Sequence, residues 1–296
     1  MEMRDIMSKI AILTDSSCDI PQELAEKYGI DIMSFHILLD DVDYIERESC
    51  TNTEFYDKMR EAKGVPSTAA ITPIQFCEKY CQYVDEGYTD VIHVPINKSG
   101  SSTYNNALMA QGMLREERPE HHLKIHLLDP HTYSMVFGWY LCEMARKLQN
   151  GAEISHVIRE FEKQMNCMEI ILGPYSLRQM KKSGRISAAA AVMGELMGIR
   201  PIITLIDGKT KVEAKVRGDE KVVPAMVELC KKRSEGVEDF DYMIGHTNIR
   251  QAEDLEKACR KAFGKPPLIV FELGGVVSAN TGPDTVALVY TGHPRG

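Results

Sequence analysis

The 296-residue sequence lacks the features that mark membrane, secreted or nucleic-acid-binding proteins. It has no apolar run of eighteen residues, and its first residues, MEMRDIMSK, are charged where a signal peptide needs an apolar stretch. Lys and Arg number 35 against 43 Asp and Glu, so the net charge of -8 offers no basic surface for a phosphodiester backbone. We therefore expect a cytoplasmic protein that neither inserts stably into a membrane nor binds nucleic acid.

The common catalytic and nucleotide-binding motifs are also missing. The sequence contains no G-x-x-x-x-G-K-[ST], no G-x-G-x-x-G, no G-x-S-x-G and no H-E-x-x-H. Its nine histidines have no spacing typical of metal ligands. On motifs alone, ligand binding is favoured over catalysis, and we predict neither a metal site nor a cofactor.

The eight cysteines form no C-x-x-C pair and no paired zinc spacing, which is typical of reduced thiols in a cytosolic chain. Cys77 and Cys81 are four residues apart, a spacing that places both side chains on one face of a helix. We interpret them as a buried or half-buried pair of free thiols, with a metal or redox role as the alternative.

The first half of the chain alternates apolar strands with helical patterns, which predicts βαβ units and a mostly parallel sheet. The predicted strands are Lys9–Leu13, Ile30–Leu39, Val91–Val94 and Ile125–Leu128, and the predicted helices are Pro21–Tyr28, Thr53–Glu61, Pro73–Glu86, Ser102–Glu117, Tyr133–Leu148 and Ile154–Met165.

The character of the chain changes near Cys167, which divides it into predicted domains 1–166 and 167–296. Asp207-Gly208 between two β-rich runs is the signature of a tight hairpin, so the second half contains antiparallel pairing and is expected to hold a mixed sheet. Its other predicted strands are Glu169–Gly173, Tyr242–His246, Leu268–Leu273 and Val286–Tyr290, and its main helices are Glu220–Arg233 and Ile249–Phe263.

Three loops rich in small hydroxyl side chains follow or precede these elements: TDSSCD at 14–19, PSTAAITP at 66–73 and NKSGSST at 97–103. Loops at the carboxyl ends of strands are where open α/β sheets bind ligands, and the N-terminus of a helix favours an anion. Ser and Thr are also preferred helix caps, so capping is the alternative for each loop taken alone.

Six short segments, in order along nearly the whole chain, resemble the DegV family of bacterial fatty-acid-binding proteins. They are TDSSCDIP, the Thr68 loop, SSTYNNA, GRIS, the strand end at Arg217 and NTGPD. The resemblance implies an α/β fold of two domains, the first an α/β/α domain with a parallel sheet and the second built on a six-stranded mixed sheet. It also implies a long-chain fatty acid at the domain junction, and a role as the carrier subunit that presents this acid to a separate ATP-dependent fatty acid kinase.

The resemblance further assigns the groups that bind the carboxylate. Carried onto this sequence, they are Thr68, Ser101, Arg185 and Arg217, with Asn280 in place of the family's pocket histidine. A glycine of the family motif is replaced by Asp284. An asparagine amide does not titrate, so we expect head-group binding without histidine-linked pH dependence between about pH 5 and 7.

An apolar helical stretch after Arg185 offers candidates to line the tail, with ordinary core packing as the alternative. They are Ile186, Val192, Met193, Leu196, Met197 and Ile199. The resemblance implies an acid of 14 to 18 carbons, such as palmitate, stearate or oleate. The leading hypothesis is a carrier without catalytic activity of its own. The alternatives are an enzyme acting on a small phosphorylated or carboxylated metabolite in the interdomain cleft, and a regulatory or scaffold protein that senses lipid.

Overall fold

The first half of the protein is built around a four-stranded parallel sheet. The computed structural model describes residues 9–184 and 198–295. The strand order is β2-β1-β6-β7, with every neighbouring pair parallel. The strands are β1 (Ile10–Asp15), β2 (Ile30–Met33), β6 (Asp90–Val94) and β7 (Lys124–Leu127). The predicted parallel sheet is therefore confirmed.

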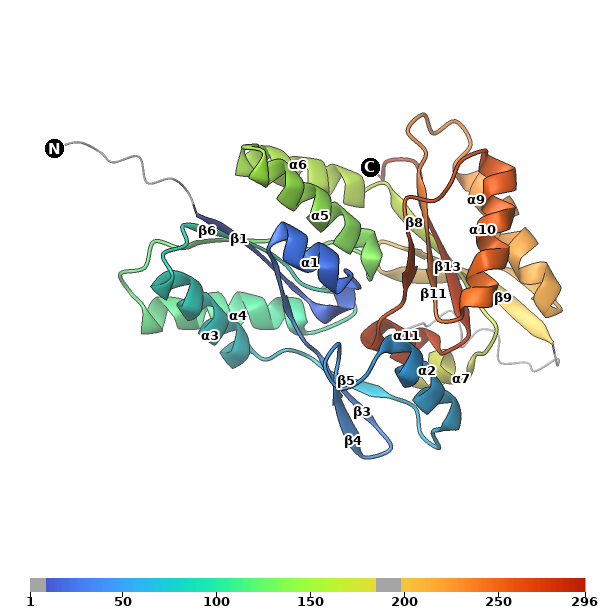
Figure 1. The fold of residues 1–296 in the computed structure, drawn as a ribbon, viewed down its shortest axis with the longest axis horizontal. Helices are drawn as coiled ribbons and strands as arrows, with labels where there is room; N and C mark the ends of the chain where they lie inside the picture. The colour runs from blue at the N-terminus through green and yellow to red at the C-terminus, as the bar shows by residue number, and fades with distance from the viewer. Residues whose placement is uncertain (1–8, 185–197, 296) are drawn as a thin grey trace.

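Helices cover both faces of this sheet. Successive residues of β1 point in opposite directions, so they pack against helices on opposite faces. Ile12 packs in the cluster that contains Leu141, whereas Leu13 packs with Phe76. Helices α1, α5 and α6 lie on one side of β1 and β6, and α3 and α4 lie on the other (Figure 1). The bounds are α1 (Gln22–Tyr28), α3 (Pro73–Asp85), α4 (Thr103–Glu117), α5 (Met135–Gln149) and α6 (Ile154–Met165).

A small antiparallel sheet, with the order β4-β3-β5, extends from the first half. The prediction of one strand over Ile30–Leu39 was wrong, since the chain leaves the parallel sheet after Met33 and β3 pairs with two other partners. The remaining bounds are β3 (His36–Leu39), β4 (Val42–Ile45), β5 (Ser67–Ala69) and α2 (Asn52–Glu61).

The second half contains a six-stranded mixed sheet with the order β10-β9-β8-β13-β11-β12. Only β11 and β12 pair in parallel, and the other neighbours are antiparallel. Asp207 and Gly208 both have positive φ, as a type I′ hairpin between β9 and β10 requires. The strands are β8 (Met168–Pro174), β9 (Ile199–Ile206), β10 (Lys209–Arg217), β11 (Tyr242–His246), β12 (Val270–Glu272) and β13 (Thr285–Thr291).

Two long helices, α9 and α10, cover the outer face of the six-stranded sheet (Figure 1). Its inner face turns toward the first half, where α11 lies against α7, α2 and the short helix after β1. The sequence interpretation contained no helix at the position of α11. The bounds are η1 (Ser16–Cys18), α7 (Arg178–Ser183), η2 (Asp219–Lys221), α9 (Val222–Arg233), α10 (Ile249–Phe263) and α11 (Gly275–Thr281).

The two halves share one buried cluster, which joins Leu141 and Phe137 of α5 to Ile170 and Val289 of the six-stranded sheet. Polar contacts add to this interface. Asp284 pairs with Arg60 of α2 at 3.2 Å. We propose the domain division at residues 166 and 167, between the end of α6 and the start of β8, as the sequence predicts.

Candidate ligand-binding cavity

A cavity of about 180 Å³ lies between the carboxyl ends of the parallel strands and the inner face of the six-stranded sheet. Its first-half lining comes from segments that follow strands: Phe35 follows β2, Ile96 follows β6 and Tyr133 follows β7. This edge is where open α/β sheets bind ligands, because the chain turns there from strand to helix and frees backbone and side-chain donors.

Two of the hydroxyl side chains that line the cavity belong to predicted head-group residues. Thr68 lies on β5, and among the residues that the structure describes its hydroxyl has no hydrogen-bond partner. Ser101 also lines the cavity, and its Oγ accepts a hydrogen bond from the backbone N–H of Thr103 at 3.2 Å. Thr103 begins α4, so the first turn of the helix, whose N–H groups have no acceptor within the helix, and the positive end of the helix dipole lie next to Ser101. Such donors suit a small anion.

Helix α11 brings two more polar side chains to the cavity, Asn280 and Thr281. Asn280 Nδ2 donates to the carbonyl of Val276 at 2.9 Å, and Thr281 Oγ1 donates to that of Val277 at 3.2 Å. The amide nitrogen of Asn280 carries two hydrogens, so one donor is left beyond the bond within the helix.

Most of the remaining lining is apolar and comes from the inner face of the six-stranded sheet. Ile170 pairs with Val289 and Leu172 pairs with Ala287, so two neighbouring strands present four apolar side chains to the cavity. The two pairs are separated by about 7 Å along the strands. The other apolar lining residues are Phe35, Ala70, Ile96, Val136, Leu205, Phe271, Leu273, Val276 and Val277.

The sequence interpretation missed these strand residues, although their alternation carries the signal. In β8, Ile170 and Leu172 face the cavity, while Ile171 between them is fully buried against the outer helices. A strand that is buried on both faces has a continuous apolar sequence. The sequence therefore does not show which face packs against helices and which face borders a cavity.

Behind the cavity wall, the first hydroxyl-rich loop forms a buried network of hydrogen bonds. Asp15 accepts the backbone N–H of Ile96 at 2.7 Å, and Ser16 Oγ accepts that of Phe35 at 3.0 Å. Ser134, which lines the cavity, donates its hydroxyl to Asp19. The TDSSCD loop therefore supports the wall instead of lining it, unlike the loops of Thr68 and Ser101.

The carboxyl groups of this network have raised pKa values because they are removed from water. Burial raises the pKa of Asp15 to about 7, and burial followed by the charge of Glu46 raises that of Asp19. Burial also raises the pKa of Glu46, which accepts the N–H of Val276 at 2.8 Å and the hydroxyl of Ser16. A protonated carboxyl group carries no negative charge. These groups therefore repel an anion in the cavity less than ionised carboxylates would.

The structure thus brings three of the predicted head-group residues, Thr68, Ser101 and Asn280, to one cavity. Arg217 is exposed at the end of β10, and the half-buried Ile199 begins β9; neither is among the residues that line the cavity. The remaining predicted residues lie outside the described part of the chain. They are Arg185, Ile186, Val192, Met193, Leu196 and Met197.

An α/β fold with two sheets and a largely apolar cavity that carries a few hydroxyl donors is typical of ligand-binding proteins. The family model described as "uncharacterised protein, DegV family" matches residues 9–292. The chain belongs to the DegV family. A DegV domain-containing protein of Clostridium acetobutylicum is 29% identical to it, over 95% of this chain and 97% of that protein.

Solved structures of the family have the same fold. The structure of a fatty-acid-binding DegV family protein from Streptococcus agalactiae is 26% identical, with a TM-score of 0.84, over 98% of this chain and all of that one. A stearic-acid-binding protein from Eubacterium ventriosum is 22% identical, with a TM-score of 0.87, over 97% of this chain and 98% of that one. The latter likeness supports the fold.

Among the described residues, no helix combines the length and the apolar character needed to cross a bilayer.

Proposed function

We propose that the protein binds a long-chain fatty acid between its two halves, with the carboxylate at Thr68 and Ser101. The observation that carries this proposal is the hydroxyl of Thr68, which has no hydrogen-bond partner among the described residues and lies in a cavity whose other walls are mainly apolar strand residues. The fatty-acid-binding relative from Streptococcus agalactiae, matched over its whole length, supports the same ligand class. Asn280 is proposed to supply a further neutral donor, and Arg185 and Arg217 are proposed as basic groups that attract the carboxylate.

The energetics of such a ligand agree with this lining. Burial of methylene groups contributes about 0.8 kcal/mol each, so a sixteen-carbon tail gains on the order of 10 kcal/mol before entropy costs. A hydrogen bond to a charged group contributes roughly 1.5–3 kcal/mol. The tail therefore sets the affinity and the hydroxyls set the orientation. We propose acids of 14 to 18 carbons, a range that includes the stearic acid bound by the Eubacterium ventriosum protein.

The ligand proposal is tested by the contents of the purified protein and by one pair of variants. Denaturation of the protein, expressed in two different hosts, is expected to release about one equivalent of a C14 to C18 acid on mass spectrometry. Thr68→Val is expected to weaken binding of palmitate at least about tenfold, because one bond to the carboxylate is lost. Ser67→Ala is the matched control, since Ser67 is exposed on the same strand and does not line the cavity. Equal affinities of the two variants would contradict the carboxylate position.

We further propose that the protein is a lipid-binding carrier without catalytic activity, which presents its acid in the cytoplasm to a separate ATP-dependent fatty acid kinase. The loaded protein with ATP alone is expected to yield no acyl phosphate, as measured by hydroxamate formation. Addition of a bacterial fatty acid kinase is expected to yield it, and yield is expected to fall with Thr68→Val at limiting acid. Acyl phosphate formed by the protein alone would refute the carrier role.

A further inference from the structure

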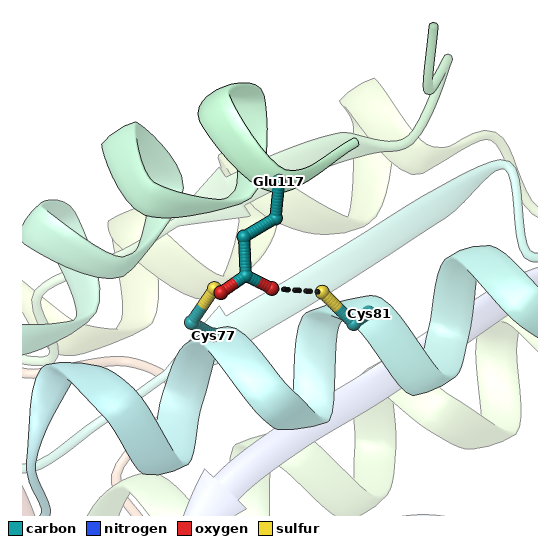
Figure 2. A group of neighbouring side chains, drawn as sticks. All are labelled: Cys77, Cys81 and Glu117. Carbon is teal, nitrogen blue, oxygen red and sulfur yellow. Dashed lines mark hydrogen bonds between the residues drawn. The ribbon is translucent and has the colours of Figure 1, made fainter. Parts of the chain in front are cut away.

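Away from the cavity, two thiols and one carboxylate meet between α3 and α4. Cys77 and Cys81 lie one turn apart on α3, and Glu117 reaches them from the last turn of α4. Figure 2 shows the carboxylate placed between the two sulfur atoms. One ligand atom from each residue lies within 4.8 Å of the other two, and Cys81 Sγ donates to Glu117 Oε2 at 3.4 Å.

The spacing of the two thiols fits a bridging metal ion better than a disulfide. Side chains one helical turn apart have Cβ atoms about 5–6 Å from one another, whereas a disulfide needs about 3.5–4.5 Å. Two thiolates on a tetrahedral Zn²⁺ ion, with Zn–S distances of about 2.3 Å, hold their sulfur atoms about 3.8 Å apart. That separation lies inside the observed limit of 4.8 Å, so rotation about the side-chain bonds is sufficient.

The burial of the three groups defines the character of the cluster. Cys77 and Cys81 are 2% and 8% exposed, whereas Glu117 is exposed at the surface. The Glu117 side is therefore the side of the cluster that is open to solvent. Glu78 adds negative charge beside Cys77, and the opposing cation, Arg118, is turned toward Asp85 at 3.6 Å. Sulfur and carboxylate ligands together suit Zn²⁺ better than the harder Mg²⁺ or Ca²⁺ ions.

We propose that Cys77, Cys81 and Glu117 form a Zn²⁺ site that joins α3 to α4. On binding, the two S–H bonds break, two Zn–S bonds form, and both protons pass to solvent, while the Glu117 carboxylate exchanges its bond to the thiol for one to the metal. The proposal is independent of fatty acid binding.

The first test uses Co²⁺ as a spectroscopic substitute for Zn²⁺ in the reduced full-length protein. We expect one equivalent of Co²⁺ to produce a sulfur-to-cobalt charge-transfer band, one equivalent of Zn²⁺ to abolish it, and about two protons to be released per metal ion. The double variant Cys77→Ser/Cys81→Ser is expected to lose the band. Cys50→Ser, which removes a half-buried thiol elsewhere, is the matched control and is expected to keep it.

Glu117→Gln provides a second test that leaves the packing of both buried thiols intact. We expect it to weaken metal binding by more than about tenfold, the loss caused even by removal of an outer-shell partner. Glu116→Gln, one residue earlier and also exposed, is expected to have no effect. Zn²⁺ at a hundredfold excess over its Kd is expected to raise the Tm of the wild type by about 5 °C, and not that of the double-serine variant.

Two results would overturn the proposal. One is a wild-type spectrum without a charge-transfer band at saturating Co²⁺. The other is a double-serine variant that is folded by circular dichroism and retains the band, because another group of thiols would then hold the metal.

Discussion

At the scale of single residues, Asp15 places a buried carboxyl group directly behind the cavity wall. It is completely buried, yet it accepts hydrogen bonds from Ser17 N at 3.1 Å, Ser17 Oγ at 2.5 Å and Ile96 N at 2.7 Å. These donors offset part of the cost of burial, but desolvation dominates and raises the pKa to about 7. Asp15 therefore changes charge near neutral pH, directly behind the loop that leads to Ser101.

This raised pKa gives stability a predictable pH dependence. Because the pKa of Asp15 is about 7 in the folded protein and about 3.8 when unfolded, the folded state binds more protons in that interval. The contribution of Asp15 to the free energy of unfolding is thus fully present at low pH. It decreases by about 3 kcal/mol between pH 5 and pH 8.

Urea unfolding at pH 5 and pH 8 measures this difference. Asp15→Asn is expected to remove that part of the pH dependence, whereas the exposed Asp239→Asn is expected to keep the wild-type change. An identical pH change in the wild type and Asp15→Asn would contradict the raised pKa.

At the scale of elements, the β9–β10 hairpin connects the two halves at the cavity. Gly208 at its tip lines the cavity and lies against the loop that leads to Ser101. A Cβ atom at Gly208 would approach Asn97 Nδ2 to 2.3 Å and Ser99 Oγ to 2.4 Å, and its φ is +71°. The backbone conformation favours glycine at this position, and an added Cβ atom would force the side chains of Asn97 and Ser99 to move.

Gly208→Ala is expected to destabilise the protein more than Gly151→Ala and to weaken fatty acid binding. Gly151 also has positive φ, +85°, but nothing lies within 4 Å of its added Cβ, so it isolates the backbone cost of about 1–2 kcal/mol. The additional loss of stability in Gly208→Ala, relative to Gly151→Ala, measures the cost of displacing the 97–102 loop. Equal thermal unfolding midpoints and equal palmitate affinities for the two variants would show that this loop accommodates the methyl group.

At the scale of the whole molecule, one arginine holds the start of α7 to the end of α2. Arg178 Nη2 donates to the carbonyls of Ala62, Lys63 and Gly64 at 2.7, 2.7 and 2.8 Å. These carbonyls come directly after the last residue of α2, Glu61. The contact links the two halves on the side where α11 and β5 border the cavity.

Arg178→Ala is expected to lower the free energy of unfolding by about 2 kcal/mol, because three carbonyls lose a charged donor at a half-buried site. Arg178→Lys is expected to recover part of the loss, since an ammonium group keeps the charge without the planar fork. Arg159→Ala, which removes an exposed arginine on α6, is the control and is expected to keep the wild-type stability. Chemical denaturation measures all three, and a wild-type midpoint for Arg178→Ala would exclude this role.

Much of the fold was predictable from local patterns. The predicted ranges Tyr242–His246, Ile249–Phe263 and Ile154–Met165 coincide with β11, α10 and α6. Where the prediction failed, tertiary contacts override the local pattern. The run Ile30–Leu39 is mostly apolar, but its two ends belong to different sheets, and the short α11 has only seven residues.

The sequence by itself determined the alternation of strands and helices, the hairpin at Asp207-Gly208, and the hydroxyl-rich loops at the strand ends, because these follow from side-chain periodicity and turn chemistry. Only the tertiary structure decided which apolar residues border the cavity and which loop supports its wall. It also placed Glu117 beside Cys77 and Cys81 and Arg60 beside Asp284. These contacts join residues 36 to 224 positions apart, and no local pattern encodes them.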